Sequence, residues 1–150
     1  MNYSIFSDEY FMNEALKEAR QAYDRDEVPV GAVMVLNNRI IARGRNMTEE
    51  LTDVTAHAEM ICITSAANYL GAKYLPDCTL YVTIEPCGMC ASATRWAQLG
   101  KIVYGASDPK AGYGVLGKQV LHPRTDVVSG VLENECGNLM TDFFAKKRAL

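Results

Sequence analysis

The sequence predicts an α/β protein in which helices cover both faces of a sheet, a three-layer α/β/α sandwich. Segments with apolar residues at helical spacing alternate with short β-branched runs, the pattern of strands and helices that pack as layers. The chain has 150 residues and is 49% hydrophobic, enough for one domain with a core and too short for two ordinary ones. No internal repeat, low-complexity segment or linker interrupts it. We therefore expect residues 1–150 to form a single domain.

The first two elements are a helix and a hairpin. Ser7 is a preferred N-cap residue, and apolar residues recur at helical spacing after it, which predicts an amphipathic helix over about residues 8–25. Residues 30–36 are an apolar, β-branched run. Residues 37–38 are two asparagines, which tolerate positive φ, and residues 39–42 return as a strand. These residues predict a β-hairpin.

The middle of the chain predicts two helices and two strands, each bounded by glycine or proline. In order they are a helix from at or beside His57 to near Gly71, a strand over 79–84 broken by Pro86, a helix over 87–99 capped by Gly100, and a strand over 101–105. Residues 108–123 are glycine-rich and irregular. A short strand at 126–128 and a closing helix at 133–149 complete the chain, and we expect the helix to turn Leu139, Met140, Phe143 and Phe144 inward.

Composition excludes several classes of protein. No run of about 18 apolar residues exists that could span a bilayer, and the first residues lack the pattern of a signal peptide. Five cysteines, an odd number, suit reduced thiols better than a disulfide scaffold. A net charge of −3 gives no general attraction to polyanions, although residues 146–148 are a local basic patch. We expect a soluble, cytoplasmic protein with no membrane partner.

One cysteine pair requires a chemical explanation. Cys87 and Cys90 follow Pro86 at the start of a helix, where the positive helix end lowers thiol pKa values. At this spacing both sulfurs can face one point, and zinc is the usual ion at mixed sulfur and nitrogen sites. A lone C-x-x-C also occurs in redox pairs and in structural zinc knuckles. The sequence contains no second C-x-x-C, which disfavours the knuckle.

The third ligand is expected to be a histidine. His57 opens the neighbouring helix, whereas His122 lies in the irregular segment, so His57 is the better candidate. Three protein ligands leave a fourth tetrahedral position for water, as in catalytic zinc sites. Glu59 is the nearest carboxylate, but two residues along a helix turn it by about 200°, so both side chains converge only if His57 is the non-helical cap. Glu59 would then move the protons.

These residues form a known signature. The H-x-E of residues 57–59 and the P-C-x-x-C of residues 86–90 are typical of zinc-dependent nucleobase deaminases. From about residue 8 to 148 the chain resembles the zinc-dependent cytidine and deoxycytidylate deaminase family, and within it the bacterial tRNA adenosine deaminases. The stretches that match are residues 27–33, 55–59, 80–87 and 143–144.

The resemblance implies a cytidine deaminase-like fold with a central mixed five-stranded sheet, a homodimer with one Zn²⁺ per subunit, and conversion of the wobble adenosine of a tRNA anticodon to inosine. It further implies that Asn46 contacts the bound base or ribose, that Asp108 contacts a flanking nucleotide, and that Val30 and Ala32 line the base pocket. Taken alone, Asn46 and Asp108 are also ordinary turn residues.

Two other functions fit the same residues. A deaminase of a free base or nucleoside, such as guanine, cytosine or cytidine in nucleotide salvage, would share the metal chemistry but not the RNA contacts. A non-catalytic, zinc-stabilised binding protein would keep the fold and dispense with Glu59. Activity on free bases without RNA separates the first of these from tRNA editing, and Glu59→Gln separates the second.

Overall fold

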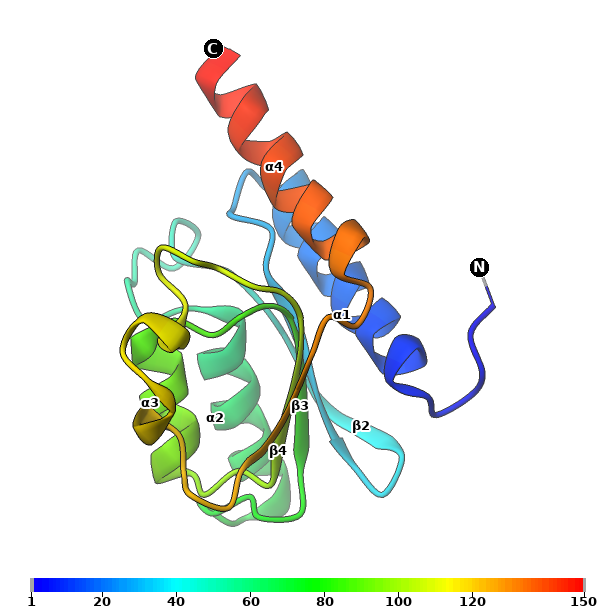
Figure 1. Cartoon of the computed structure of the whole chain (residues 1–150), viewed down its shortest axis with the longest axis vertical. Helices are drawn as coiled ribbons and strands as arrows, with labels where there is room; N and C mark the ends of the chain where they lie inside the picture. The colour runs from blue at the N-terminus through cyan, green and yellow to red at the C-terminus, as the bar shows by residue number, and fades with distance from the viewer. Residues whose placement is uncertain (1, 150) are drawn as a thin grey trace.

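The chain folds around a five-stranded sheet with helices on both faces (Figure 1). The computed structural model describes residues 2–149. Its helices are α1 (Asp8–Asp24), α2 (Ala58–Leu70), α3 (Gly88–Trp96) and α4 (Glu133–Ala149), and its strands are β1 (Gly31–Leu36), β2 (Arg39–Arg45), β3 (Thr79–Ile84), β4 (Lys101–Ala106) and β5 (Asp126–Ser129). Two 3₁₀ turns, η1 (Tyr113–Val115) and η2 (Lys118–Val120), lie in the segment expected to be irregular.

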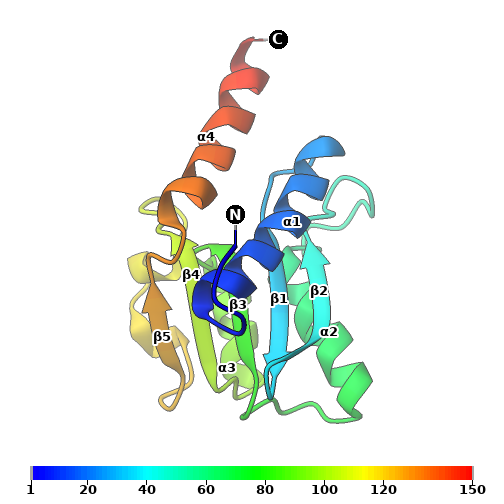
Figure 2. The same ribbon diagram turned by 90° about the vertical axis from the view of Figure 1, so that its right-hand side faces the viewer.

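The sheet is mixed and separates two apolar cores. Its strand order is β2-β1-β3-β4-β5, as seen face-on in Figure 2. β1 pairs antiparallel with β2 and β3, whereas β3, β4 and β5 are parallel. One core lies under α2 and α3 and the other under α1 and α4, on the opposite face (Figure 1). The predicted three-layer arrangement and five-stranded mixed sheet are confirmed.

Local signals fixed the first elements as expected. The Ser7 hydroxyl accepts a hydrogen bond from the Tyr10 amide at 3.1 Å, and α1 begins at the next residue. Asn37 and Asn38 have φ values of 51° and 61°, the left-handed pair that a two-residue hairpin turn requires. β2 runs to Arg45, beyond residue 42, and pairs with β1 up to Gly31. Gly44 lets α2 approach this strand, since a Cβ there would lie 2.4 Å from the Ala58 carbonyl oxygen.

The prediction for the third helix was wrong at its end. α3 stops at Trp96 rather than at residue 99, and Gln98 then takes a positive φ of 53°. Gly100 is therefore not a helix cap. It is needed for a close approach, since a Cβ at this position would lie 2.2 Å from the Pro76 carbonyl oxygen.

The closing helix packs on the sheet with its first half and extends beyond it with its second (Figure 1). Phe143 is buried against Tyr23 of α1 as expected, with ring centroids 5.7 Å apart. Phe144, also expected to face inward, is 40% exposed, so the prediction was wrong for this residue: α1 covers the neighbouring Phe143 instead. Leu139 and Met140 are half-buried. Neither α4 nor any other helix within residues 2–149 is long and apolar enough to cross a membrane.

Candidate metal and catalytic site

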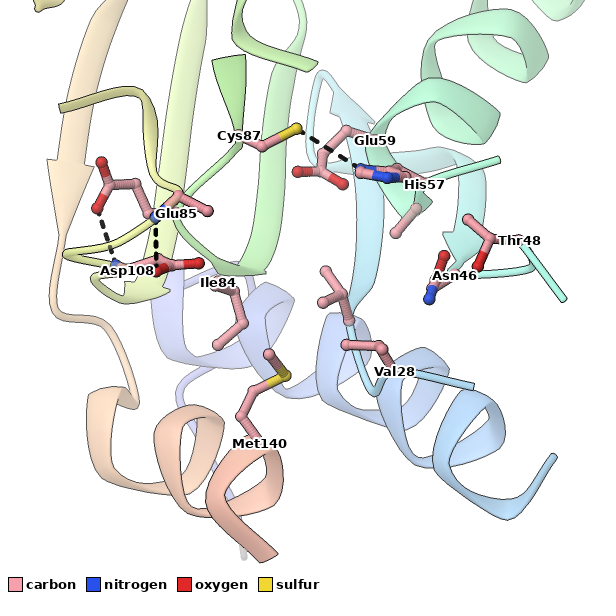
Figure 3. Close-up of a pocket in the computed structure, with 13 residues that line it drawn as sticks. Val28, Asn46, Thr48, His57, Glu59, Ile84, Glu85, Cys87, Asp108 and Met140 are labelled. Atoms are coloured by element: carbon pink, nitrogen blue, oxygen red, sulfur yellow. Dashed lines mark hydrogen bonds between the residues drawn. The ribbon is translucent and has the colours of Figure 1, made fainter. Parts of the chain in front are cut away.

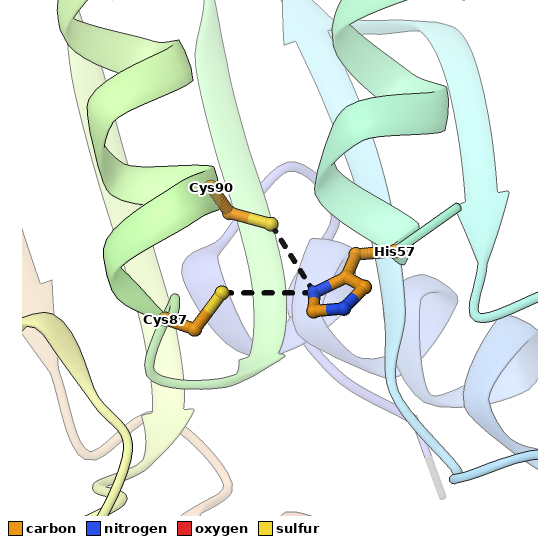
Figure 4. Close-up of side chains that lie close together, drawn as sticks. All are labelled: His57, Cys87 and Cys90. Carbon is orange, nitrogen blue, oxygen red and sulfur yellow. Dashed lines mark hydrogen bonds between the residues drawn. The ribbon is translucent and has the colours of Figure 1, made fainter. Parts of the chain in front are cut away.

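His57, Cys87 and Cys90 meet at the start of two helices on the same face of the sheet (Figure 4). His57 is the N-cap of α2 and Cys87 the N-cap of α3, and both have extended backbone angles (φ −77°, ψ 155° and φ −70°, ψ 172°). Cys90 lies in the first turn of α3. The fold therefore brings Cys87 and Cys90 at the start of α3 next to His57 at the start of α2, although Cys87 follows His57 by 30 positions in the chain.

The spacing of the three ligand atoms fits a tetrahedral metal ion. His57 Nδ1 lies 3.6 Å from Cys87 Sγ and 3.5 Å from Cys90 Sγ. Tetrahedral zinc with ordinary zinc–sulfur and zinc–nitrogen bonds of about 2.3 and 2.05 Å separates nitrogen from sulfur by about 3.6 Å. Among the described residues this is the only group of three or more histidine, cysteine or acidic side chains close enough to hold an ion.

The pKa of Cys87 is lowered as expected, whereas that of Cys90 is not. Hydrogen bonds from Cys90 and His57 lower the pKa of Cys87 to about 3, and the Cys90 backbone N–H at the helix start adds to this. The pKa of Cys90 is raised instead, because its thiol donates to Cys87 and is buried. The pKa of His57 is raised by its hydrogen bond to Cys87. The protein's own groups thus favour one thiolate, and a second would need a bound cation.

Glu59 lies beside these ligands in the first turn of α2. Because His57 is the non-helical cap, both side chains point into the same space (Figure 3), as the sequence required. Glu59 is 3% exposed, and its Oε1 has no hydrogen-bond partner among the described residues. Burial raises the pKa of its carboxyl to about 7. A carboxyl with a pKa near neutrality can both accept and donate a proton.

A pocket of about 270 Å³ opens in front of Glu59 and His57 (Figure 3). Its walls are mostly apolar, with a few polar groups, as is common for small-molecule sites. The residues lining it are Val28, Val30, Asn46, Thr48, His57, Ala58, Glu59, Ile84, Glu85, Cys87, Asp108, Ala111 and Met140.

Three of the four predicted substrate contacts line this pocket: Val30, Asn46 and Asp108. Ala32 does not. It is fully buried in the core under α2, where its carbonyl accepts a hydrogen bond from the Cys62 thiol at 3.3 Å. Ala32 lies inside β1, whereas Val30, which lines the pocket, directly precedes that strand.

Asn46 and Asp108 differ in whether their side-chain oxygens already accept hydrogen bonds within the protein. Asn46 is 7% exposed, and its side-chain oxygen is buried without a partner among residues 2–149. Asp108 accepts hydrogen bonds on one oxygen from the Lys110 and Ala111 amides, at 3.1 and 3.0 Å. The turn-forming interpretation of Asp108 is therefore correct, and its side chain still borders the pocket.

Several lining residues were not predicted. Thr48 lies in the loop before His57, Glu85 follows β3 directly, and Met140 comes from α4 on the far side of the sheet (Figure 3). The position of Glu85, at the end of a buried strand and two residues before Cys87, was a usable signal. Nothing in the sequence pattern connects Met140 with the H-x-E segment.

The class of protein follows from this site and from the match of residues 6–106 to the cytidine and deoxycytidylate deaminase zinc-binding region. The chain belongs to this family of deaminases and is a hydrolytic enzyme.

The chain is more similar to some members of this deaminase family than to others. The tRNA-specific adenosine deaminase of Agrobacterium fabrum is 49% identical over 93% of this chain and 95% of its own. A solved structure from a study of A-to-I editing by tRNA:A34 deaminases at the wobble position of transfer RNA is 48% identical, with a TM-score of 0.81 over 87% of this chain and 98% of its own. A guanine deaminase from Bacillus subtilis is 38% identical, with a TM-score of 0.63 over 71% of this chain and 66% of its own.

Proposed function

We propose that this chain, acting as one zinc-dependent nucleobase deaminase domain, converts adenosine to inosine at the wobble position of a tRNA anticodon. The observation that supports the chemistry is the buried Glu59 carboxyl, whose Oε1 has no hydrogen-bond partner among the described residues, beside three ligand atoms at tetrahedral spacing. The choice of adenosine in tRNA is supported by the tRNA adenosine deaminase relative, whose identity and coverage exceed those of the guanine deaminase.

Zinc is the ion that the donor set supports best. One imidazole nitrogen and two cysteine sulfurs are a borderline-soft set, and they leave a fourth position open toward the pocket. His57 Nδ1, Cys87 Sγ and Cys90 Sγ would hold one Zn²⁺ per subunit. When bound, the ion supplies Lewis acidity that lowers the pKa of a coordinated water to about 7.

Glu59 moves the protons in the proposed reaction. Its unpartnered Oε1 takes a proton from the attacking water as the water oxygen bonds to C6 of adenine. The displaced C6–N1 π electrons move to N1, which receives this proton from the carboxyl. The carboxyl then moves the remaining hydroxyl proton to the exocyclic nitrogen, so that the C6 carbonyl forms as the C6–N bond breaks and ammonia leaves. A carboxyl pKa of about 7, which burial produces, suits a group that must do both at neutral pH.

The surrounding residues are proposed to hold the substrate. Asn46 offers a buried polar atom without a partner, and Val30 offers an apolar surface to the base. Asp108 lies at the pocket border, where a nucleotide that flanks the flipped base would pass. Because the chain carries a net charge of −3, contacts to RNA phosphates must come from local groups. The candidates are Lys110, Lys118, Arg124 and the basic residues 146–148.

The test is deamination by zinc-loaded protein of an anticodon stem-loop with adenosine at the wobble position. Free guanine, cytosine, adenosine and cytidine are assayed beside it, and a stem-loop with adenosine only at another loop position is the control. We expect inosine only in the wobble RNA. Turnover of a free base or nucleoside with untouched RNA would make the chain a salvage deaminase and overturn the proposal.

We also propose that the chain acts as a cytoplasmic homodimer. The family resemblance supports a dimer, and so do large apolar side chains exposed beside α2 and at the end of α3: Leu51 (54%), Val54 (83%) and Trp96 (78%). All five cysteines are unbridged, which agrees with a reducing compartment.

Sedimentation is expected to give twice the mass of one chain, and Trp96→Lys is expected to shift the protein toward the monomer. Ile5→Lys, which changes another exposed apolar residue (69% exposed) in the segment before α1, is the matched control. A wild-type chain that sediments as a monomer at all concentrations would contradict the dimer.

A further inference from the structure

Glu85 holds one side of the pocket through both of its carboxylate oxygens. Oε1 accepts a hydrogen bond from the Asp108 amide at 3.0 Å, and Oε2 accepts one from the Gly114 amide at 2.8 Å. These amides lie at the two ends of residues 108–114, a segment that we call the 108 loop. One side chain therefore fixes both ends of the loop that carries Asp108 and Ala111 to the pocket.

The 108 loop is also tied to the backbone next to Glu85. The Tyr113 amide donates to the Pro86 carbonyl at 2.8 Å, and Gly112 forms a bridge with Cys87. The loop packs so tightly on Glu85 that a Cβ at Gly112 would lie 2.3 Å from the Glu85 carboxyl carbon. The loop thus takes its position from the residues that lead into the metal ligand Cys87.

Glu27 binds a second segment at the pocket, residues 47–50, through both of its carboxylate oxygens. We call this segment the 48 loop. Glu27 is 2% exposed. Its Oε1 accepts from the Glu49 amide at 3.1 Å and its Oε2 from the Glu50 amide at 2.7 Å, with the Thr48 hydroxyl 3.5 Å from Oε1. This loop follows Asn46 and leads toward His57.

The two loops border the pocket on opposite sides. In Figure 3 Glu85 and Asp108 lie on one side, Asn46 and Thr48 on the other, and His57 and Glu59 between them. We propose that Glu27 and Glu85 are a pair of positioning residues that hold these two loops, and thereby Thr48 and Asp108, at the separation the substrate requires. The activity part of this proposal rests on the proposed function, whereas the loop-holding part does not.

The proposal requires a carboxylate and not merely a polar side chain of the same size. In each case both oxygens accept from backbone N–H groups. A glutamine keeps one acceptor but turns an NH₂ donor toward the second amide, so one hydrogen bond is replaced by two facing donors. Glutamine has nearly the same volume, so the surrounding packing is retained.

The experiment compares Glu27→Gln, Glu85→Gln and the control Glu49→Gln, which alters an exposed carboxylate in the 48 loop itself. Amide hydrogen exchange, zinc content, thermal unfolding and steady-state kinetics on the wobble stem-loop are measured for each. Losing a charged hydrogen bond at one amide is expected to speed exchange about tenfold in the 108 loop for Glu85→Gln and in the 48 loop for Glu27→Gln, with zinc content unchanged. KM is expected to rise about tenfold, with kcat within about twofold, because substrate binding and not proton transfer is impaired.

Unchanged amide hydrogen exchange in both loops would overturn the proposal. Faster exchange throughout the chain together with loss of zinc would also overturn it, because that result indicates a general structural role. A fall in kcat with KM unchanged would also overturn it. If the variants change amide exchange only in their own loops but the wild-type protein does not deaminate RNA, the loop-holding role is supported and the proposed substrate is refuted. Failure of the loop-holding role and failure of the proposed function are therefore distinguishable.

Discussion

Replacing Glu59 with glutamine is expected to lower kcat by about a thousandfold while zinc remains bound. Glutamine has the same shape as the buried carboxyl but can neither take a proton from water nor return one to the leaving nitrogen. General acid–base catalysis by one side chain contributes about 10²- to 10⁴-fold, and here one group serves two transfers. Inosine formation in the wobble stem-loop under single-turnover conditions measures the loss, and metal analysis of the same sample measures the zinc content.

The control for this substitution is Glu133→Gln, which removes an equal charge from an exposed position at the start of α4. It is expected to leave both turnover and zinc content unchanged. Full turnover by the Glu59→Gln protein would refute the proton-transfer role of Glu59. Absence of deamination by both the wild-type and the Glu59→Gln protein, with zinc bound in both, would favour the non-catalytic, zinc-stabilised binding protein. Loss of zinc together with activity would show that Glu59 supports the metal site rather than the chemistry.

The fold was predictable wherever a local rule acts on a few neighbouring residues. Ser7 starts α1 because its hydroxyl caps the first turn, and Asn37 and Asn38 form the hairpin because both accept positive φ. The rule failed at Gly100, where the reason for a glycine is not a helix end but contact with Pro76, more than 20 residues earlier. Close approaches between distant segments leave no periodic signal in the sequence.

The core of the site was predictable for a geometric reason. The two-residue spacing of His57 and Glu59 made sense only if His57 were the cap of α2, and the structure has it there. The raised pKa of Cys90 was not predictable from its helix position alone, because it comes from the hydrogen bond to Cys87 and from burial. Whether Asn46 and Asp108 contact a substrate stays a prediction.

The contribution of α4 to the pocket wall could not be predicted from the sequence. Met140 arrives from a helix on the other face of the sheet, and its partners in the pocket are set by how α4 packs. Ala32, which the family resemblance predicts to line the base pocket, lies two positions beyond Val30 inside β1 and is not among the residues that line the pocket. Side-chain periodicity gives the face of a strand but not how far along it a cavity extends.

Removing the metal is expected to abolish deamination and to lower the midpoint of thermal unfolding by about 10 °C. The ligands come from the starts of two different helices, so a bound ion would crosslink α2 and α3 in the folded chain and not in the unfolded one. An ion present at a thousand times its dissociation constant stabilises the folded state by about 4 kcal/mol. For a chain of this size each kcal/mol is worth about 2–4 °C. Calorimetry before and after chelation, with zinc added back, measures both effects.

The matched variants for this prediction are two buried cysteines. Cys90→Ser is expected to lose zinc and activity and to unfold near the temperature of the chelated protein, whereas Cys136→Ser, at a buried thiol outside the ligand group, is expected to keep its zinc. Reversible loss of activity with an unchanged midpoint would contradict the crosslink. In that case the first turns of α2 and α3 are held by their packing on the sheet alone, and the ion serves only the chemistry in the pocket.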